Sequence, residues 1–509
     1  MLPIIATLIA GVTIYIAAKK YFKHRYNYWE RQGVPGANCL EPGIFKPQYV
    51  HQSDVKKSEE FGHIYGYYEF FRRGIVINDP DMIREVFVKH FDKFSDHREL
   101  YFGEDAINEN LFNLPGDDRW KRIRNLISPA FTSAKLKGLM APIDEISDQL
   151  VHNLRKLVDE HNGSVELDIR GPIAAYLSDL TNSFAFSIKT DALKDPNQPI
   201  VKFGRKIFAV EFKFSLVLAV FLPKLAKFLR AEPFPVDAIN YFKQLTLELI
   251  KERRNEGSGY KRNDFLQIMI DANNEEEVNE QSSESLEKEI YESDDTYRQD
   301  VKPSVTNHTL STVEMTAQCI LFFVAGFDTT GSTLSHCLYY LAKYPDIQQK
   351  LYEEIDSIDD YGVDSLASLK YLNAVINETL RFAPPILRVE RVANETVIIK
   401  NIEIPTGTVV TVTPYSYHRD EHYWDEPNKF KPDRFIGHKH NPYLLMPFGS
   451  GPRLCLGMRF ALIEIRCCVA KVVKHFKLKI TPTDPHLEYL IGSVFFSPKE
   501  VVLSLEKRQ

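Results

Sequence analysis

The stretch FGSGPRLCLG, residues 448–457, is the most informative segment of this chain. It places one cysteine, Cys455, among three glycines and a proline, with Arg453 two residues before it. The apolar helical pattern MRFALIEIRCCVAKVV follows directly, so Cys455 lies at the predicted start of a helix. Because a helix N-terminus stabilises an anion, we expect this position to lower the pKa of the thiol. The glycines allow the backbone to approach a flat group closely and to donate N–H groups to the sulfur.

Three roles suit such a cysteine. A buried structural thiol is common, but it leaves the glycines and Arg453 unexplained. A nucleophilic thiol needs a histidine partner, and none of the fifteen histidines lies in a motif that would supply one. A thiolate ligand of haem iron explains the lone cysteine, the glycines and the arginine together, since the arginine can pair with a haem propionate.

A second informative stretch is AGFDTTGS, residues 325–332, in the middle of a long apolar pattern. Ser311 and Glu314 have the spacing of a capping box. The next proline is Pro345, which allows a helix of roughly 33 residues and about 50 Å. Because this pattern is apolar on most faces, the sequence predicts a long buried helix that crosses the domain.

The residues in the middle of that helix are unfavourable for its stability. Gly326 and Gly331 each cost about 1 kcal/mol relative to alanine, and a buried aspartate costs more unless it is paired. Two interpretations stay open for the stretch: a local opening that holds a small ligand near Asp328 and Thr329, or helix packing through small residues. An acid beside an alcohol suits proton delivery to a buried oxygen species.

Glu378 and Arg381, in NETLRFAPP, are three residues apart and share one face of a predicted helix. An exposed pair of this kind contributes well under about 1 kcal/mol. The surrounding apolar residues and prolines favour a buried pair instead.

Composition narrows the function classes. The chain has 509 residues, 44% of them hydrophobic, which is enough for a large core. Its net charge of −6 argues against a nucleic-acid binder that relies on bulk electrostatics. The six cysteines form no CxxC pairs, so the sequence suggests neither a disulfide framework nor a zinc site and favours a reducing compartment.

The N-terminus resembles a membrane anchor. Residues 2–18 carry no charge, and the basic cluster KKYFKHR follows at 19–25. A cleaved secretory signal is the alternative, but it would carry positive charge before the apolar segment. We therefore expect a transmembrane signal anchor at 1–25 with the rest of the chain in the cytosol. A linker at 26–46 and a catalytic domain at 47–509 complete the predicted organisation.

The remaining patterns predict one mainly α domain with a minor β part; a division into two units near Asn307 is the structural alternative. Helical patterns dominate, and strands are expected near the start and toward the end of the chain. In the first half of the chain, we expect two strands in 64–77 with a turn at Arg73-Gly74, a helix opened by Asp79-Pro80, and helices from Asp117 to about Ala272. A solvated acidic loop is expected at 273–307, followed by helices up to Phe382. Strands in 396–412, a helix after Cys455 and short strands from Leu487 complete the prediction.

The segment around Cys455 resembles the haem-binding signature of the cytochrome P450 monooxygenases, FxxGxRxCxG, at every position: Phe448, Gly451, Arg453, Cys455 and Gly457. Four further motifs follow in that family's order: Trp120 and Arg124 in WKRIR, the stretch AGFDTT at 325–330, Glu378 with Arg381, and PDRF at 432–435. The resemblance covers about residue 28 to the end and implies the single large, mainly α fold of that family. The residues of these motifs are most similar to those of the branch that contains the family 3 drug- and steroid-oxidising enzymes. One departure is the proline-rich hinge, which is reduced to VPGA at 34–37.

The resemblance implies a role for each matching residue. Cys455 would be the proximal ligand of the iron of haem b, and Thr329 with Asp328 would manage proton delivery. Glu378, Arg381 and Arg434 would form a buried structural triad. The haem propionates would be held by Trp120, Arg124, Arg391 and Arg453, with Arg98 as a further candidate.

The substrate pocket implied by the resemblance is apolar. It would suit a lipophilic molecule such as a xenobiotic, a steroid or a fatty-acid-like compound. The apolar stretch 203–221 would contribute to it, and residues 214–229 are either a membrane-dipping segment or an ordinary core helix. The other positions are Phe112, Leu114, Val324, Ala325, Ile386, Leu387, Val494 and Phe495.

Electrons would come from another protein, because the sequence has no GxGxxG fingerprint for a dinucleotide. The resemblance implies NADPH–cytochrome P450 reductase as the donor, cytochrome b5 as a further partner and the endoplasmic reticulum membrane as the location. The expected docking residues are Lys121, Arg122, Lys135 and Arg459. Two other functions stay open: a haem-thiolate isomerase or dehydratase that rearranges peroxides without a reductase, and a non-catalytic haem sensor or carrier.

Overall fold

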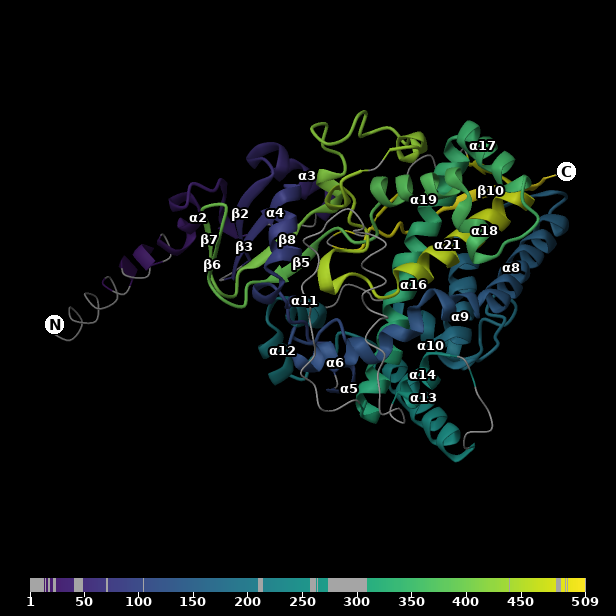
Figure 1. Ribbon diagram of the computed structural model, residues 1–509, viewed down its shortest axis with the longest axis horizontal. Helices are drawn as coiled ribbons and strands as arrows, with labels where there is room; N and C mark the ends of the chain where they lie inside the picture. The colour runs from purple at the N-terminus through teal and green to yellow at the C-terminus, as the bar shows by residue number, and fades with distance from the viewer. Residues whose placement is uncertain are drawn as a thin grey trace, which may run out of the picture.

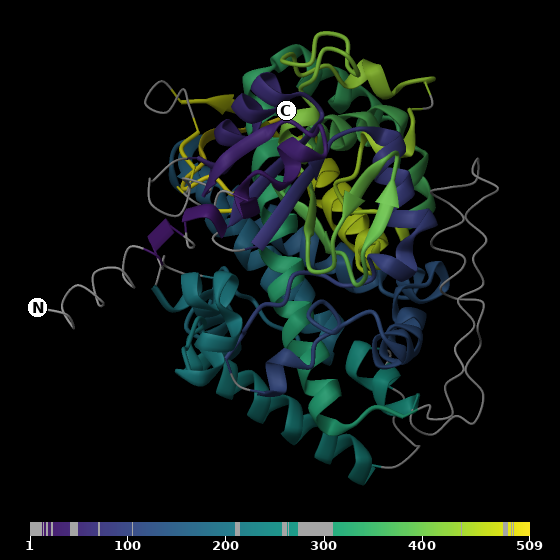
Figure 2. The ribbon, with the colours of Figure 1, turned by 90° about the vertical axis from the view of Figure 1, so that its left-hand side faces the viewer.

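The long helix predicted from the capping box is α16 (Thr312–Lys343), which crosses the computed structural model through its centre (Figures 1 and 2). Its 32 residues agree with the predicted length. The Ser311 side chain accepts the N–H of Glu314, and the Glu314 carboxylate accepts the N–H of Ser311 at 2.8 Å, so the capping box is confirmed. Four other long helices pack directly on α16: α9 (Arg170–Phe186), α13 (Val236–Glu256), α19 (Lys370–Phe382) and α21 (Met458–His475).

The structure describes residues 13–508 except 14, 17–18, 22–23, 41–48, 70–71, 104, 209–213, 257–261, 263, 273–308, 439, 482–486, 490 and 492. Most of the predicted anchor and the predicted acidic loop therefore lie outside the described residues. Among the described residues, no helix has the length and the apolar character needed to cross a bilayer.

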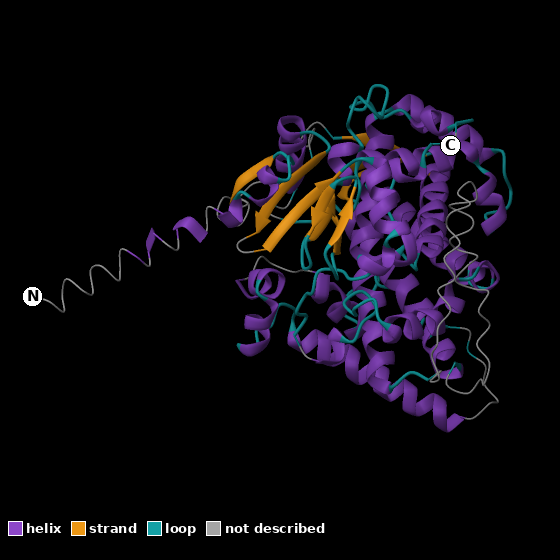
Figure 3. Cartoon of the chain, turned by 60° about the vertical axis from the view of Figure 1, so that its left-hand side comes forward, coloured by secondary structure: helices purple, strands orange, loops and turns teal. Residues whose placement is uncertain are grey.

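The strands lie together on one side of the helical body (Figure 3). The largest sheet has the order β1-β2-β3-β8-β5, in which β1 on β2 and β3 on β8 are parallel pairs and the other two pairs are antiparallel. Its strands are β1 (Gly36–Leu40), β2 (Ile64–Glu69), β3 (Arg72–Ile77), β5 (Val389–Val392) and β8 (Val409–Val412).

The predicted turn at Arg73-Gly74 is wrong. Both residues lie inside β3, where Gly74 pairs with Tyr67 and with Val409 of the neighbouring strands. The glycine is needed for packing, because a Cβ atom there would come within 2.1 Å of the Tyr67 ring. The segment between β2 and β3, residues 70–71, lies outside the described residues.

Two smaller sheets complete the β part. The strands in 396–412 are confirmed as β8 and the hairpin of β6 (Val397–Ile399) with β7 (Ile402–Ile404). A three-stranded sheet has the order β4-β10-β9, with β4 (Ser164–Asp168), β9 (Phe476–Ile480) and β10 (Val502–Lys507). The sequence patterns predicted β10 but missed β4 and β9, which are short and lie directly beside long helices.

The helical prediction is confirmed for most of the chain. Asp79 caps α4 by accepting the N–H of Met82, and Asp117 caps α6 by accepting the N–H of Trp120. The remaining helices are α2 (Tyr28–Arg31), α3 (Val50–Phe61), α4 (Pro80–Arg84), α5 (Asp105–Asn108), α6 (Asp118–Ile127), α7 (Ser133–Lys137), α8 (Met140–Glu160), α10 (Pro199–Phe208), α11 (Phe214–Phe221), α12 (Pro223–Phe228), α14 (Phe265–Asp271), α17 (Pro345–Asp356), α18 (Val363–Ser368) and α20 (Pro414–Tyr417).

The described part of the segment predicted as a linker, residues 26–40, takes part in the folded body. Trp29 and Val34 are 2% and 4% exposed and belong to a core cluster with residues of β3 and α4. Strand β1, which lies in this segment, pairs with β2 of the largest sheet, so the packed part of the molecule begins before residue 47.

Candidate active site

The loop that carries Cys455 is a tight turn between the helical body and α21. Its Cys455 N–H donates to the Phe448 carbonyl at 2.9 Å, which closes the loop on itself. Gly449 and Gly451 have φ angles of +79° and +71°, which favour glycine. At Gly451 a Cβ atom would lie 1.9 Å from the Phe87 carbonyl oxygen, so this glycine allows the loop to approach the protein itself rather than a ligand.

The Cys455 side chain is exposed, although Leu454 before it is buried. Although part of the Cys455 surface is accessible, the surrounding protein atoms desolvate the thiol and raise its pKa, whereas the backbone N–H groups of Gly457 and Met458 and the charge of Arg124 lower that pKa. The net shift is upward, which corrects the expectation that the helix start alone favours the thiolate. A metal cation bound at this sulfur would deprotonate it.

Arg453 of this loop and Arg124 of α6 both lie close to the indole ring of Trp120. The guanidinium of Arg453 lies 4.2 Å from the Trp120 ring centroid, and that of Arg124 lies 5.6 Å from it. Arg124 also donates to the Leu454 carbonyl at 3.0 Å, directly before Cys455. Trp120 is 2% exposed, so its ring is a platform for the two cations.

Arg391 is the third cation of this group. It is 1% exposed, donates to the Ser450 carbonyl at 3.3 Å and lies over the Phe87 ring at 4.6 Å. Burial lowers the pKa of Arg453 to about 9, and the positive charges of Arg391 and Arg124 act in the same direction. We call Arg124, Arg391 and Arg453 the arginine cluster. Such a concentration of positive charge in a buried place suits a ligand that carries carboxylates.

Arg98 does not belong to the arginine cluster. Its guanidinium donates to Glu69 at 2.6 and 3.0 Å and to Glu390 at 2.7 and 2.8 Å, and all three side chains are mostly buried. Glu69 of β2 and Glu390 of β5 accept hydrogen bonds from all three guanidinium nitrogens of Arg98. The expectation that Arg98 holds a propionate is therefore wrong.

The middle of α16 is the open face of this helix. Ala325 is exposed, and a Cβ atom on Gly326 would meet nothing within 4 Å, whereas one on Gly331 would lie 3.3 Å from Leu177 of α9. The interpretation of helix packing through small residues therefore fits Gly331, whereas ligand binding near Asp328 and Thr329 stays a prediction. The Thr329 hydroxyl donates to the Ala325 carbonyl at 2.8 Å on this open face.

Asp328 turns toward the C-terminal segment. Both of its carboxylate oxygens lie 3.4 Å from the Ser497 hydroxyl. Burial raises the pKa of Asp328, while Arg170 and Ser497 oppose that rise. The acid and the alcohol of the sequence motif are thus adjacent in the chain but have different partners.

The Cys455 loop and the open face of α16 are connected through packed aromatic rings. Phe460, in the first turn of α21, lies 5.8 Å from Phe322 of α16, measured between ring centroids. Leu111 donates its N–H to Gln318 of α16 at 2.8 Å, which brings the segment with Phe112 to the same helix.

The predicted pocket residues divide by burial. Ala325, Phe112, Val494 and Phe495 are exposed, with 43–44% exposure for the last three. Val324 and Ile386 are half-buried. Leu114 and Leu387 are only 5% and 2% exposed and belong to the main core, which is a correction to their assignment as lining side chains.

Backbone pairing brings four of these residues together. The Leu387 N–H donates to the Val494 carbonyl at 2.9 Å, and Ile386 forms a β-bridge with Phe495. The two chain segments therefore run side by side, although about a hundred residues separate them.

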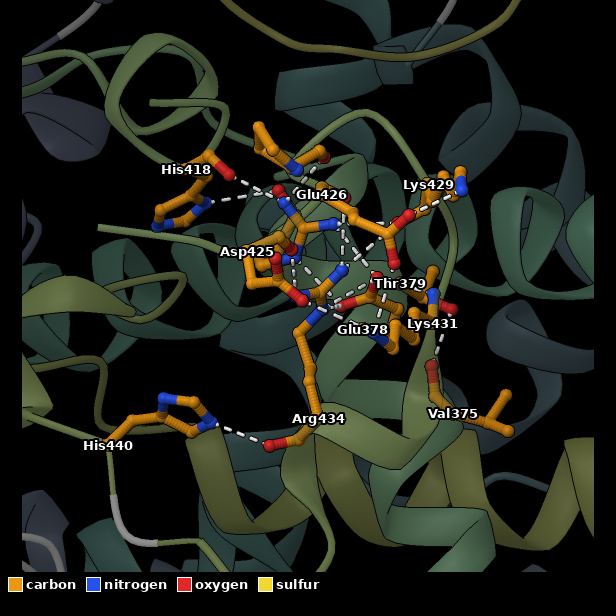
Figure 4. A network of polar contacts seen from close by, with 12 residues as sticks. Val375, Glu378, Thr379, His418, Asp425, Glu426, Lys429, Lys431, Arg434 and His440 are labelled. Carbon is orange, nitrogen blue, oxygen red and sulfur yellow. Dashed lines mark hydrogen bonds and ion pairs between the residues drawn. The ribbon is translucent and has the colours of Figure 1, made fainter. Parts of the chain in front are cut away.

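Glu378, Arg381 and Arg434 form a buried network that fastens α19 to the segment after β8 (Figure 4). Arg381 donates to both carboxylate oxygens of Glu378 at 2.8 Å, and Arg434 donates to the same oxygens at 3.1 and 3.2 Å. The side chains are 0%, 0% and 7% exposed, so the exposed-pair alternative is wrong. Both arginines also donate to backbone carbonyls of the segment between His418 and Lys429.

The expected docking residues differ in accessibility. Arg122 is 13% exposed and pairs at 2.5 Å with Glu314, the capping residue of α16, which removes it from any docking face. Lys121 is half-buried and pairs with Asp118, whereas Lys135 is exposed and Arg459 is half-buried.

Residues 214–229 have one buried and one exposed face. Leu218 and Ala219 are buried in α11, whereas Phe214 and Phe228 are 74% and 82% exposed. The two helices therefore contribute to the core, as one interpretation expects, and also expose apolar rings; contact with a membrane stays a prediction. Residues 209–213 of the stretch 203–221 lie outside the described residues.

Sequence reasoning missed two polar residues at this site, Ser497 beside Asp328 and His97 beside the arginine cluster.

The residues present fit a haem group. The accessible thiol lies in a loop flanked by the arginine cluster, and an open helical face packs nearby. In the described part of the chain, no group of three or more His, Cys, Asp and Glu side chains has the arrangement of a metal site. Carboxylates on a haem bound at Cys455 would neutralise the arginines.

Comparisons with known proteins agree with this assignment. The family model described as Cytochrome P450 matches residues 43–293 and 294–504. Cytochrome P450 3A12 of Canis lupus familiaris is 33% identical over 508 residues, which cover 96% of this chain and 94% of the relative. Cytochrome P450 3A7 of Homo sapiens is 35% identical over 506 residues with the same coverage, and Cytochrome P450 3A9 of Rattus norvegicus is 35% identical over 481 residues, covering 90% and 88%. With a family model matched along most of its length and relatives above 30% identity, the chain belongs to the cytochrome P450 family of monooxygenases.

Proposed function

We propose that this protein is a haem-thiolate monooxygenase of the endoplasmic reticulum membrane, facing the cytosol from a single N-terminal anchor. It inserts one atom of dioxygen into a lipophilic substrate with NADPH-derived electrons from a reductase. The observation that carries this proposal is the accessible thiol of Cys455 beside the arginine cluster. When bound, haem b supplies the iron chemistry that activates dioxygen.

Cys455 would hold the iron through its thiolate. The N–H groups of Gly457 and Met458 donate to that sulfur and tune its basicity, as hydrogen bonds to a metal-bound thiolate do. The arginine cluster, with Trp120 as its platform, holds the propionates. The buried triad around Glu378 is structural and keeps α19 in place behind this loop.

Thr329 and Asp328 supply protons. The Thr329 hydroxyl lies on the open face of α16, where it passes a proton between water and the reacting oxygen. Because burial raises the pKa of Asp328, its carboxyl holds a proton closer to neutral pH, as a general acid requires. Ser497 orients that carboxyl.

The substrate is lipophilic, and its class is xenobiotic, steroid or fatty-acid-like. The support is the apolar character of the exposed side chains near the open face: Phe112, Ala325, Val494 and Phe495. A site lined this way binds through burial of apolar area and offers few polar anchors.

The membrane and the electron donor meet different parts of the surface. The exposed rings of Phe214 and Phe228 support contact of α11 and α12 with the bilayer surface. Lys121, Lys135 and Arg459 remain the candidates for docking NADPH–cytochrome P450 reductase, and cytochrome b5 is a further partner for the same basic surface.

An isotope experiment tests the proposed reaction. The full chain is reconstituted in lipid with reductase and NADPH, using testosterone and lauric acid as steroid and fatty-acid probes under ¹⁸O₂. We expect a hydroxylated product that carries one ¹⁸O atom and forms only with NADPH. Rapid rearrangement of a lipid hydroperoxide without NADPH, with no labelled product, would support the isomerase instead.

A further inference from the structure

Three polar contacts fasten the segment 489–497, here called the pocket segment, to one face of α16. The helical partners are spaced by four residues, so they follow one another along that face. The contacts join Asp328 with the Ser497 hydroxyl at 3.4 Å, Ser332 with the Phe496 carbonyl at 2.7 Å, and His336 with the Tyr489 hydroxyl at 3.1 Å. The helical face that holds Asp328 therefore also holds the pocket segment.

His336 can only accept a hydrogen bond from Tyr489. Its Nδ1 lies 2.8 Å from the Ser332 carbonyl, which is an acceptor, so Nδ1 carries a proton and donates it. Burial and, to a smaller extent, the charge of Arg419 lower the pKa of His336 to about 4, while the bond to Ser332 opposes them. The neutral imidazole therefore has an unprotonated Nε2, and the Tyr489 hydroxyl donates to it.

Stacked rings surround this hydrogen bond. The rings of Tyr489 and Phe496 have centroids 4.0 Å apart, and the His336 ring lies 5.3 Å from that of Phe496, each pair with planes 8° apart. Stacking sets the separation and the tilt of the rings, whereas a hydrogen bond at one ring edge also sets their lateral position. The contact with His336 therefore completes the placement of Tyr489.

The pocket segment carries two exposed side chains of the proposed substrate site. Val494 and Phe495 are 44% and 43% exposed, whereas Phe496 beside them is 3% exposed. Tyr489 forms a β-bridge with Pro498, so the two ends of the segment are paired with each other. A displacement of Tyr489 would therefore move the exposed side chains relative to the open face of α16.

We propose that His336 is a positioning residue for the substrate. Through Tyr489 it holds the pocket segment in the place that determines which carbon of a lipophilic substrate lies nearest to Thr329. His336 is 0% exposed, so it acts through Tyr489 and not by contact with the substrate. This inference rests on the proposed function, because it requires a substrate to be oxidised at this site.

Two conservative variants test the proposal in the full-length haem-loaded protein with reductase and NADPH. Tyr489→Phe and His336→Phe each remove the hydrogen bond and keep a ring in the stack. We expect each to change the ratio of positional isomers of hydroxylated testosterone, and of hydroxylated lauric acid, by about threefold or more, because a small displacement changes which carbon is oxidised. A loss of folded protein alone would leave this ratio unchanged, since all product comes from the folded fraction.

The double variant shows whether the two residues act through one bond. His336→Phe combined with Tyr489→Phe should change the isomer ratio no more than the larger single effect, because both substitutions remove the same interaction. It also replaces both polar partners by apolar rings, so it leaves no buried polar group without a partner and keeps the test valid if a single variant folds poorly.

Hydrogen exchange followed by mass spectrometry tests the contact without turnover. The amides of 493–497 should exchange about fivefold faster in each single variant than in wild type. Tyr415→Phe is the matched control, since its ring also lies 5.0 Å from that of Phe496 but the change leaves the His336–Tyr489 bond intact. This control should match wild type in both measurements.

The outcomes separate this inference from the proposed function. Unchanged isomer ratios in the single variants, or effects that add in the double variant, would overturn the positioning role of His336. Unchanged hydrogen exchange in the single variants would overturn it as well, whatever the activity. A wild type that forms no NADPH-dependent product would contradict the proposed function instead.

Discussion

The Thr329 hydroxyl lies on the open face of α16, where we expect it to affect catalysis more than the stability of the folded protein. Its side chain donates to Ala325 within the same helix, while Thr333, one turn later, donates to the Thr329 carbonyl at 2.9 Å and is buried. The two threonines make the same kind of local bond in different surroundings. A comparison of their alanine variants therefore isolates the effect of position.

We predict that Thr329→Ala separates NADPH consumption from product formation. Without the hydroxyl, proton delivery fails and reduced oxygen leaves as hydrogen peroxide, so product per NADPH should fall about tenfold or more. Peroxide release and product are measured together in the reconstituted system. Thr333→Ala should keep the wild-type ratio; an unchanged ratio in Thr329→Ala would exclude its role in proton delivery.

Glu464 is a buried acid of α21 that serves no proposed chemical step. It is 3% exposed, and burial raises its pKa well above the usual value. Because the folded pKa exceeds the unfolded value, folding favours the protonated acid. The stability that this group contributes is fully present below the unfolded pKa of about 4.3 and decreases as pH rises toward the folded pKa.

We predict that Glu464→Gln stabilises the protein at high pH. The variant should match wild type near pH 4.5 and exceed it increasingly above that, by at least about 1 kcal/mol at pH 8. Urea midpoints at several pH values check this, with the exposed Glu166→Gln as control. A constant difference between Glu464→Gln and wild type across the pH range would contradict the explanation.

The residue roles were only partly predictable. The spacing of FGSGPRLCLG identified Cys455 and Arg453 because a motif fixes backbone geometry locally. It did not show that Arg98 pairs with Glu69 and Glu390 while His97 turns to the arginine cluster, because that choice depends on acids distant in sequence.

At the scale of elements, a buried network of charged side chains holds helix α19 in position. Glu378 is fully buried and accepts from Arg381, from Arg434 and from the N–H of Lys431 at 2.7 Å. Removal of this carboxylate would leave two guanidinium groups buried beside each other. A buried cation without its partner is strongly destabilising.

We predict that Glu378→Ala lowers the free energy of unfolding by roughly 3–5 kcal/mol and reduces the yield of haem-loaded protein. Asp433→Asn is a matched control from the same region, since Asp433 pairs with Lys350 at the surface with both side chains about half exposed. That control should change stability by less than about 1 kcal/mol. Urea unfolding followed by circular dichroism measures both, and equal effects would contradict a buried role for Glu378.

The long elements were predictable and the short ones were not. The capping box at Ser311 and the proline at 345 gave α16 almost to the residue, because both signals act on the local backbone. The turn between β2 and β3 was placed too late, since glycine is a turn signal, whereas Gly74 serves the packing of the Tyr67 ring. β4 and β9 become strands through pairing with β10, a partner that local sequence does not reveal.

The whole molecule presents one side with exposed apolar side chains. α11 and α12 lie on the same side as α2 and the β6–β7 hairpin (Figure 1). Phe214, Phe228 and Ile398, from these elements, are 74%, 82% and 67% exposed. In the proposed orientation, these side chains belong to the surface that faces the bilayer.

We predict that a tryptophan at position 228 enters the lipid. The three native tryptophans are each 2% exposed, so Phe228→Trp adds an accessible indole on this side. In vesicles of brominated phosphatidylcholine its fluorescence should be quenched relative to ordinary phosphatidylcholine. Leu247→Trp, at a 40% exposed position of α13, is the control and should not be quenched. Equal quenching of both would contradict the proposed orientation.

The central claim is that Cys455 gives this fold a thiolate-ligated haem. The most direct test is the absorption spectrum of the reduced, carbon monoxide-treated full-length protein, for wild type and Cys455→Ser. We predict a strongly red-shifted Soret band in wild type that is lost in the variant, because only a thiolate ligand produces that shift. A wild-type band like that of histidine-ligated haem, or a red-shifted band that survives in Cys455→Ser, would contradict the account.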